Sequence, residues 1–282
     1  MVRVINPGFY TTIQDRGRYG YRHFGVPVSG AMDKISFDLA NQLLSNDVNA
    51  AVMEITMSGP ELHFLTHTYI TITGALMSPV LNGTNIINNE VYKVNPGDVL
   101  TFGKLIKGYR TYLGLKNGFM TENVLESRSY IKCITHSDSI KKGQEIHIAT
   151  IDSFQKPSGT LKKRRPLLSE ELIHVYKGPE YYQLSDKQLE ELFSKPFHIA
   201  NENNRMGYQL KEPIMPHTKT MITSVVLPGT VQLTPSGKLI ILMRDGQTTG
   251  GYPRILQLSE EAISVLAQKK VNDMISFKLE KY

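Results

Sequence analysis

The residues best suited to chemistry lie close together near the start of the chain, in residues 14–33, which read QDRGRYGYRHFGVPVSGAMD. This first stretch combines arginines, a histidine, carboxylates and several glycines. Arginine can stabilise a developing oxyanion, and histidine or aspartate can move a proton. The stretch has neither helical nor strand periodicity, so it predicts a shaped polar loop. An ordinary surface loop remains the alternative from composition alone.

Two further polar stretches carry matching chemistry much later in the chain. Residues 201–208 read NENNRMGY, and residues 244–253 read RDGQTTGGYP. Arginine and backbone N–H groups can donate to an oxyanion, while amide and hydroxyl side chains can orient a planar amide or ureido group. We expect the three stretches to meet in the folded chain, because loops held by a rigid sheet commonly carry binding sites.

The elements that must position these stretches are mostly strands. Between residues 51 and 116, short apolar runs are separated by turn signals such as Asn82-Gly83, which predicts a barrel or a sandwich. Further strands are expected at residues 129–134, 145–149 and 221–227. Residues 230–234 and 239–243 predict a hairpin around Pro235-Ser236-Gly237.

Three short helices are expected. Apolar residues recur at helical spacing from Met32 to Leu44, with Ser29 or Asp33 as the cap. The N-terminus of this helix would point its dipole at the first stretch and favour an anion there. Residues 185–195 form a second helix with a capping box, and Ser259 begins a third.

The domain organisation follows from a change of composition at residues 152–171. Two prolines, a Ser-Gly pair and a run of four cations make this segment the best linker candidate. The chain is long enough for one large domain or two ordinary ones, with 282 residues.

Composition excludes several classes of protein. The formal net charge is +6, and much of the excess lies in the linker, so nothing indicates nucleic-acid binding. The lone cysteine, Cys133, fits a reducing compartment. No apolar run reaches the length of a membrane span. These features predict a soluble cytoplasmic protein that binds neither nucleic acid nor membrane.

Familiar catalytic motifs are missing from the sequence. It contains no P-loop for ATP, no dinucleotide-binding glycine motif and no G-x-S-x-G nucleophile elbow. His63 and His67 lie four residues apart, but no third ligand accompanies them, so a structural role is favoured over metal binding. We therefore expect no metal site.

The polar stretches also carry a family resemblance. Together with EITMSGPEL at residues 54–62 and VLPGTVQLTPSGKLIILM before the third stretch, they resemble the allophanate hydrolase subunit 2 family. That family includes KipA, the C subunit of bacterial 5-oxoprolinase (PxpC) and the matching half of the urea carboxylase carboxyltransferase domain. Arg16, Tyr19 and Arg244 depart from the family pattern, and Arg244 is a cation that would alter substrate choice.

The resemblance implies a mainly β fold of two cyclophilin-like β-barrels with a few short helices. The first barrel region would span residues 1–160 and the second residues 161–282, with segments that can exchange between them. The resemblance also implies a KipI-type (subunit 1) partner. A biotin carrier and a biotin carboxylase, or a LamB/YcsF-type subunit, would complete the assembly.

The implied function is that of an enzyme subunit, inactive alone, in an ATP-dependent 5-oxoprolinase or a biotin-dependent carboxyltransferase. Carboxybiotin would come from a separate carrier protein, or ATP would be bound by another subunit, with neither held tightly by this chain. The alternative is a regulatory protein that antagonises a KipI-type kinase inhibitor. Prolyl isomerase activity is disfavoured, because fold does not imply function and the chain has no tryptophan.

Matching the family motifs residue by residue gives the candidate site. We expect the catalytic residues to be Asp15, Arg18, His23 and Arg205, with Arg18 or Arg205 as the donor to the oxyanion and Asp15 or His23 as the proton carrier. The expected binding residues are Gln14, Asp33, Asn204, Gly207, Asp245, Gln247, Thr248, Thr249, Gly250, Gly251 and Tyr252.

Overall fold

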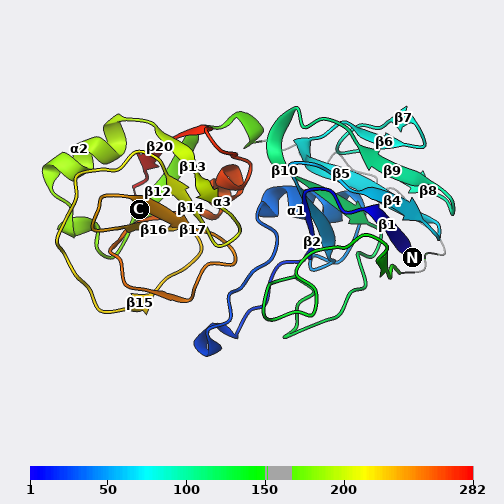
Figure 1. Cartoon of the computed structure of the whole chain (residues 1–282), viewed down its shortest axis with the longest axis horizontal. Helices are drawn as coiled ribbons and strands as arrows, with labels where there is room; N and C mark the ends of the chain where they lie inside the picture. Colours follow the sequence, from blue (N-terminus) through cyan, green and yellow to red (C-terminus); the bar gives the residue numbers. More distant parts are fainter. Residues whose placement is uncertain (150, 152–166, 282) are drawn as a thin grey trace. The chain divides into compact units, whose positions relative to one another are not determined.

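The structure is a computed structural model that describes residues 1–149, 151 and 167–281 (Figure 1). Most of the predicted linker, residues 152–166, lies outside the described residues. The chain divides into two compact units. Unit 1 comprises Met1–Arg18 and Ser29–Leu168, and unit 2 comprises Tyr19–Val28 and Ser169–Tyr282. The middle of the first stretch therefore belongs to a different unit from its two ends.

Unit 1 contains two antiparallel sheets among its described residues. The first has the strand order β11-β1-β4-β9-β6-β7 and the second the order β2-β3-β10-β5-β8. The strands are β1 (Val2–Asn6), β2 (Tyr10–Gln14), β3 (Val52–Thr56), β4 (Glu61–Phe64), β5 (Thr68–Leu76), β6 (Pro79–Leu81), β7 (Thr84–Asn85), β8 (Val91–Val94), β9 (Val99–Phe102), β10 (Lys107–Leu115) and β11 (Glu145–Ile146).

The core of unit 1 lies between these sheets. Val4 and Leu62 from the first sheet share one buried cluster with Ile55 and Leu113 from the second. Helix α1 (Lys34–Leu43) packs against β10 and β5. Because side chains alternate along a strand, Tyr112 of β10 joins the smaller cluster with α1 while Leu113 faces the main core.

Helix α1 begins where the sequence predicts, with Asp33 rather than Ser29 as its cap. The Asp33 carboxylate accepts hydrogen bonds from the backbone N–H groups of Ile35 and Ser36, both at 3.0 Å. The negative charge expected at this helix end is therefore the Asp33 carboxylate itself. The carboxylate of the chain itself already occupies the N–H groups that a ligand would need.

Unit 2 closes into a barrel of seven strands, in the order β12-β19-β16-β17-β14-β13-β20, drawn in yellow-green to red in Figure 1. The parallel pairing of β20 with β12 closes the circle. The strands of unit 2 are β12 (Leu172–Lys177), β13 (Phe197–Asn203), β14 (Gly207–Leu210), β15 (Ser224–Val225), β16 (Thr230–Leu233), β17 (Leu239–Leu242), β18 (Thr249–Gly250), β19 (Arg254–Leu258) and β20 (Met274–Leu279). The predicted mainly β fold is confirmed.

The helices of unit 2 also follow the sequence signals. In α2 (Asp186–Ser194), the Ser185 side chain accepts from the Gln188 N–H, and the Gln188 side chain accepts from the Ser185 N–H, which is the predicted capping box. In α3 (Glu260–Ala267), Ser259 is the cap. Three 3₁₀ turns complete the described elements: η1 (Arg22–Phe24), η2 (Leu167–Ser169) and η3 (Tyr181–Gln183).

Three predicted strands are shorter or missing. Residues 129–134 form no strand, because their polar groups bind elsewhere: Ser129 hydrogen-bonds to the Asp15 carboxylate, and the Ile131 N–H donates to Thr135 at 2.9 Å. The strand expected at 145–149 is limited to β11, and the one at 221–227 to β15. Apolar runs in these places do not have a continuous strand partner.

The predicted hairpin is present as β16 and β17, and its turn depends on Gly237. This residue has a φ of +83°, and a Cβ there would lie 1.9 Å from the carbonyl oxygen of Ile214. We expect Gly237→Ala to lower the free energy of unfolding of unit 2 by about 1–3 kcal/mol or more. Gly83→Ala is the matched control, because that glycine has a φ of +78° with nothing within 4 Å. Equal losses in urea unfolding would contradict the steric argument.

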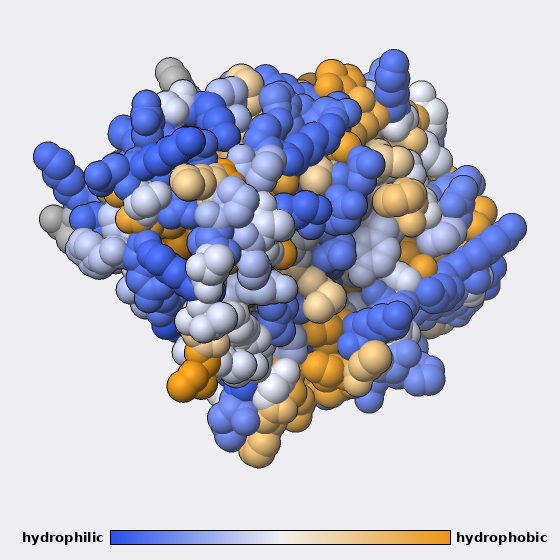
Figure 2. Space-filling model, turned by 60° about the vertical axis from the view of Figure 1, so that its left-hand side comes forward, coloured by the Kyte–Doolittle hydropathy of each residue, from blue (hydrophilic) through white to orange (hydrophobic). Residues whose placement is uncertain are grey.

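The surface is largely polar on the face shown in Figure 2, where hydrophobic residues form small separate groups. Several large apolar side chains of unit 2 are nevertheless exposed, among them Phe24 of the segment Tyr19–Val28 and Ile222 just before β15. In the described part of the chain, each helix is too short to cross a membrane.

Candidate functional site

Asp15, at the start of the first stretch, is the centre of a buried network in unit 1. One carboxylate oxygen accepts from the Gly17 N–H at 2.8 Å and from the hydroxyls of Ser127 and Ser129 at 2.7 and 2.6 Å. The other accepts from the Arg128 N–H at 2.6 Å. Asp15 therefore ties the start of the stretch to residues 127–129.

Gln14 and Arg18 extend this network. Arg18 is fully buried, and its guanidinium donates to the carbonyl oxygens of Ser129 at 2.7 Å and Val124 at 3.5 Å. The Gln14 amide donates to the carbonyl oxygen of Tyr130 at 3.1 Å. These side chains hold the segment around residues 124–130, so the Arg18 guanidinium is not an exposed donor at the surface of unit 1.

The other end of the first stretch lies on a second buried network, which the sequence did not single out. Glu54 of β3 accepts hydrogen bonds from the Met32 N–H at 2.8 Å and from the Tyr112 hydroxyl at 2.9 Å. The same hydroxyl accepts from the Asp33 N–H at 2.8 Å. Burial, together with the nearby Glu54 charge, raises the pKa of Tyr112 well above its ordinary value. This network could have been predicted from Glu54, a glutamate inside the otherwise largely apolar strand VMEIT.

The middle of the first stretch, residues 19–28, belongs to unit 2, and Arg22 attaches it there. The Arg22 guanidinium donates to the carbonyl oxygen of Val226 and, at 3.4 Å, to that of Thr248. Partial burial lowers the pKa of Arg22. His23 and Phe24 follow in η1, both exposed, with ring centroids 3.9 Å apart. Arg22 was not among the predicted site residues, although it lies inside the predicted stretch.

The second and third stretches meet through a buried ion pair. The Arg205 guanidinium donates to both carboxylate oxygens of Asp245, at 2.7 and 2.9 Å, and the two side chains are 5% and 11% exposed. The Asp245 N–H also donates to the Arg205 carbonyl oxygen at 2.9 Å. Asn204 turns the chain beside them, because its side-chain oxygen accepts from the N–H groups of Met206 and Gly207.

The third stretch offers the exposed polar groups of the site. Gln247, Thr249, Gly251 and Tyr252 are exposed, while Thr248 is half-buried. Thr249 and Gly250 form β18, which pairs with β15, and the Thr248 carbonyl oxygen accepts from the Val226 N–H at 3.1 Å. Backbone pairing therefore fixes the loop while its side chains remain available to a ligand.

Arg244, one of the three departures from the family pattern, also forms an ion pair. Its side chain is buried, and its guanidinium donates to the Glu260 carboxylate in the first turn of α3. The cation therefore points to the start of a helix, where Glu260 is favourably placed. Asp245, the next residue, pairs with Arg205 instead.

Glu180 and Arg254 form a further ion pair that the sequence did not reveal. Arg254 directly follows the third stretch. Arg254 donates to the two Glu180 oxygens at 2.9 and 2.7 Å and to the Val225 carbonyl oxygen at 2.7 Å. The side-chain hydrogen bonds between Arg254 and Glu180 lower the pKa of Glu180 and raise that of Arg254.

The lowered pKa of Glu180 gives a pH-dependent prediction. A carboxyl group with a lowered folded-state pKa stabilises the fold above its ordinary pKa of about 4.3, and this stabilisation is lost as pH falls through the lowered value. We expect Glu180→Gln to lower the free energy of unfolding by about 1–2 kcal/mol at neutral pH. Urea unfolding at several pH values should show the difference shrinking in acid. A constant difference would contradict the assignment.

Taken together, the structure brings part of the predicted site into one unit. His23, Asn204, Arg205, Gly207 and the third stretch belong to unit 2, where Arg22 and the Arg205–Asp245 pair connect the three segments. Gln14, Asp15, Arg18 and Asp33 belong to unit 1 and make the buried contacts described above. Within the described residues, no three His, Cys, Asp or Glu side chains gather to hold a metal ion.

The exposed groups on unit 2 define what this arrangement can do. The Gln247 amide, the Thr249 and Tyr252 hydroxyls and the His23 imidazole can donate, accept or transfer protons. Such groups suit a planar amide or ureido ligand, which needs both donors and acceptors. The buried Arg205–Asp245 pair joins the second stretch to the third.

Comparison with known proteins gives the family. The family model described as "Carboxyltransferase domain, subdomain A and B" matches residues 24–279. The chain is 32% identical to the C subunit of 5-oxoprolinase from Escherichia coli (strain K12) over 286 residues, covering 98% of this chain and 90% of that one. It is 30% identical to the urea amidolyase of Lachancea kluyveri, covering 97% of this chain and 16% of that one.

A solved structure agrees with these matches. The crystal structure of Kluyveromyces lactis urea carboxylase superposes with a TM-score of 0.87 at 28% sequence identity, covering 98% of this chain and 27% of that chain. The resemblance predicted from the polar stretches is confirmed. The chain belongs to the carboxyltransferase domain family of subdomains A and B, which includes the C subunit of 5-oxoprolinase and the carboxyltransferase region of urea amidolyase.

Proposed function

We propose that this chain is the C-type subunit of a multi-subunit enzyme that opens the lactam ring of 5-oxoproline. One observation carries the proposal: the match to the C subunit of 5-oxoprolinase extends over 98% of this chain and 90% of that protein. The urea amidolyase match covers only 16% of the larger enzyme, so it supports a shared domain rather than a shared overall role.

The chemistry of ring opening suits the exposed groups of unit 2. Water adds to the lactam carbonyl carbon, negative charge gathers on its oxygen, and the ring nitrogen takes a proton as the C–N bond breaks. Gln247 and Thr249 would donate to that oxygen and orient the amide. His23 would carry the proton, because it is exposed, whereas Asp15 is buried and hydrogen-bonded on both oxygens.

The buried residues take positioning roles in this proposal. Arg205 and Asp245 would hold the second stretch against the third, and Arg22 would hold residues 19–28 beside it. Arg18 and Asp15 would shape the unit 1 part of the first stretch. Asp33 would fix the start of α1. These roles follow from the contacts that each side chain makes.

ATP would supply the driving force for ring opening, and we propose that another subunit binds it. The Asp33 carboxylate already occupies the N-terminal N–H groups of α1, so this helix end does not fit a phosphate. We propose a KipI-type partner and a LamB/YcsF-type subunit as the other components, in a cytoplasmic complex in which this chain is inactive alone.

A second function, biotin-dependent carboxyl transfer, is favoured by the description of the matching family and by the superposition on urea carboxylase. Carboxybiotin on a separate carrier would then supply the carboxyl group. The same amide and hydroxyl groups of unit 2 would orient the acceptor nitrogen, and His23 would accept its proton.

Reconstitution tests the proposal. The chain should be co-expressed with the two partner subunits, and conversion of 5-oxoproline to glutamate should be measured with ATP. A parallel mixture with a biotin carboxylase and a carrier should be assayed with urea and related amides. Turnover of 5-oxoproline only when this chain is present supports the proposal. Turnover only in the biotin mixture overturns it in favour of carboxyl transfer, and partner binding with no turnover overturns it in favour of regulation.

His23→Ala tests the role of the proton carrier in the reconstituted enzyme. We expect kcat/KM to fall by at least about 100-fold, since a positioned acid or base contributes on that order. Because His23 is exposed, its loss should leave the fold intact, and circular dichroism checks this. His147→Ala, an exposed histidine of unit 1, is the matched control. Equal activities for the two variants would remove His23 from the mechanism.

A further inference from the structure

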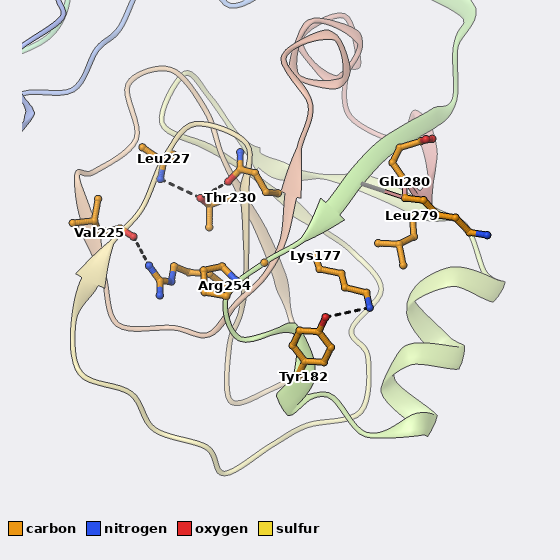
Figure 3. A pocket seen from close by; sticks show the side chains of 12 residues that line it. Lys177, Tyr182, Val225, Leu227, Thr230, Arg254, Leu279 and Glu280 are labelled. Carbon is orange, nitrogen blue, oxygen red and sulfur yellow. Dashed lines mark hydrogen bonds between the residues drawn. The ribbon is translucent and has the colours of Figure 1, made fainter.

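Unit 2 contains a cavity that the proposed function does not use. Its volume is about 840 Å³, within the range of small-molecule sites. The ends of β12, β19 and β20 line it together with η3 and the segment around β15 (Figure 3). Every residue that lines it belongs to unit 2, so the cavity is a property of this unit by itself.

Part of the wall is apolar and open to solvent. Tyr182, Val225 and Leu227 line the cavity and are 79%, 60% and 51% exposed. Leu279 of β20 adds a half-buried apolar side chain. Large apolar groups gathered around a hollow mark a binding site more often than isolated ones do, because a ligand that covers them removes apolar area from water.

Arg254 places fixed N–H donors at this cavity. Its bonds to Glu180 and to the Val225 carbonyl oxygen lock the guanidinium in one orientation. A guanidinium has more N–H donors than those three bonds use, and the described residues provide no further partner for the remainder. A pre-oriented guanidinium loses little conformational entropy when it binds an anion.

Lys177 supplies a second cation. Its ammonium nitrogen lies 4.9 and 4.8 Å from the ring centroids of Tyr181 and Tyr182, and 3.4 Å from the Tyr182 hydroxyl. Figure 3 shows the Lys177 and Tyr182 side chains directed toward each other at the cavity. No carboxylate among the described residues pairs with Lys177, whereas Glu180 and Glu280, the nearby acids, pair with Arg254 and His174.

We propose that this cavity binds a small organic acid. Its carboxylate would lie between Lys177 and Arg254, and its apolar body would cover Val225, Leu227, Leu279 and the Tyr182 ring. A single negative charge matches the Lys177 ammonium beside the locked guanidinium. The apolar wall disfavours a small, fully hydrated anion such as phosphate. The proposal goes beyond the proposed function and does not depend on it.

The position of Val225 makes binding detectable without any enzyme assay. Val225 belongs to β15, whose only described ladder is the short pairing with β18. A ligand that packs on Val225 and Leu227 should slow amide hydrogen exchange in residues 222–227, because it stabilises this two-residue ladder.

The experiment uses the whole chain with hexanoate, hexanamide and inorganic phosphate as probes in isothermal titration calorimetry. We expect hexanoate to bind saturably and at least about 10-fold more tightly than hexanamide, since hydrogen bonds between two charged groups are stronger than those to a neutral amide. Phosphate should bind more weakly than hexanoate. Hexanoate, but not hexanamide at the same concentration, should slow exchange in residues 222–227.

Variants locate the site. Lys177→Gln should weaken hexanoate by about 10-fold and leave hexanamide unchanged, whereas Leu227→Gln should weaken both. Lys187→Gln is the matched control, because Lys187 is an exposed lysine of α2 that does not line the cavity. Equal binding of the acid and the amide overturns the proposal, as does an equal effect of the two lysine variants or the lack of saturable binding. These outcomes are read from binding and hydrogen exchange in this chain alone, so they do not require 5-oxoproline turnover.

Discussion

Replacing Asp15 with alanine should destabilise unit 1 by roughly 3–6 kcal/mol, because buried donors that lose a charged acceptor each cost about 1–3 kcal/mol. The donors are the N–H groups of Gly17 and Arg128 and the hydroxyls of Ser127 and Ser129. Water can reach some of them after the change, so the total stays below the simple sum. The measurement is urea unfolding followed by circular dichroism.

Hydrogen exchange then shows where the loss lies. Protection should fall in β2 and in residues 124–130, while the barrel of unit 2 keeps its protection. Asp15→Asn should give a smaller loss, because it retains one acceptor oxygen. Glu122→Ala is the control, because Glu122 is an exposed acid two residues before that segment. A loss for Asp15→Ala no larger than that for Glu122→Ala would refute the network and return Asp15 to the candidates for proton transfer.

The second large loss of stability is expected for Asp245→Ala, which removes the Asp245 carboxylate. The change leaves the Arg205 guanidinium buried without the carboxylate that binds it at 2.7 and 2.9 Å. Breaking one side of a buried ion pair typically costs about 3–5 kcal/mol. We expect a loss of that size in the unfolding of unit 2, together with faster hydrogen exchange in residues 201–208.

A double variant separates the cost of burying one charge of the pair without the other from the value of the pair itself. Arg205→Met with Asp245→Leu removes both charges, and replacement of a buried pair by apolar residues of similar size is often close to neutral. The double variant should therefore be more stable than Asp245→Ala alone. Glu190→Ala, an exposed acid of α2, is the control. A double variant no more stable than Asp245→Ala would show that the pair carries little coupling.

Local signals in the sequence were sufficient for much of the fold. The capping box of Ser185 and Gln188 and the Asp33 cap involve residues two or three positions apart, so a pattern reveals them directly. The hairpin around Gly237 is equally local. The strand expected at residues 129–134 failed because its apolar run was read without its partners, which include Asp15, 114 positions away from Ser129.

The burial of the site residues could not be predicted either, because their partners are distant in the sequence. The sequence marked Arg18 and Arg205 as cations in polar stretches and therefore as accessible donors. Their partners, Ser129 and Asp245, lie 111 and 40 positions away, and only the fold brings them together. Composition cannot distinguish a buried arginine from an exposed one when the neutralising groups are so distant. Arg22 and Arg254 were missed for the same reason, since Arg22 binds the backbone carbonyl oxygen of Val226 and Arg254 binds that of Val225.

The assignment of residues 19–28 to unit 2 has a consequence for biosynthesis. The ribosome makes this segment long before it makes Ser169–Tyr282, with which the segment is grouped. During translation, the Arg22 guanidinium must remain without its final partners, the carbonyl oxygens of Val226 and Thr248, until the C-terminal half has emerged. A fragment that starts at Ser169 would lack residues 19–28. We expect it to recover native hydrogen exchange near Val226 only when a peptide of residues 19–28 is added.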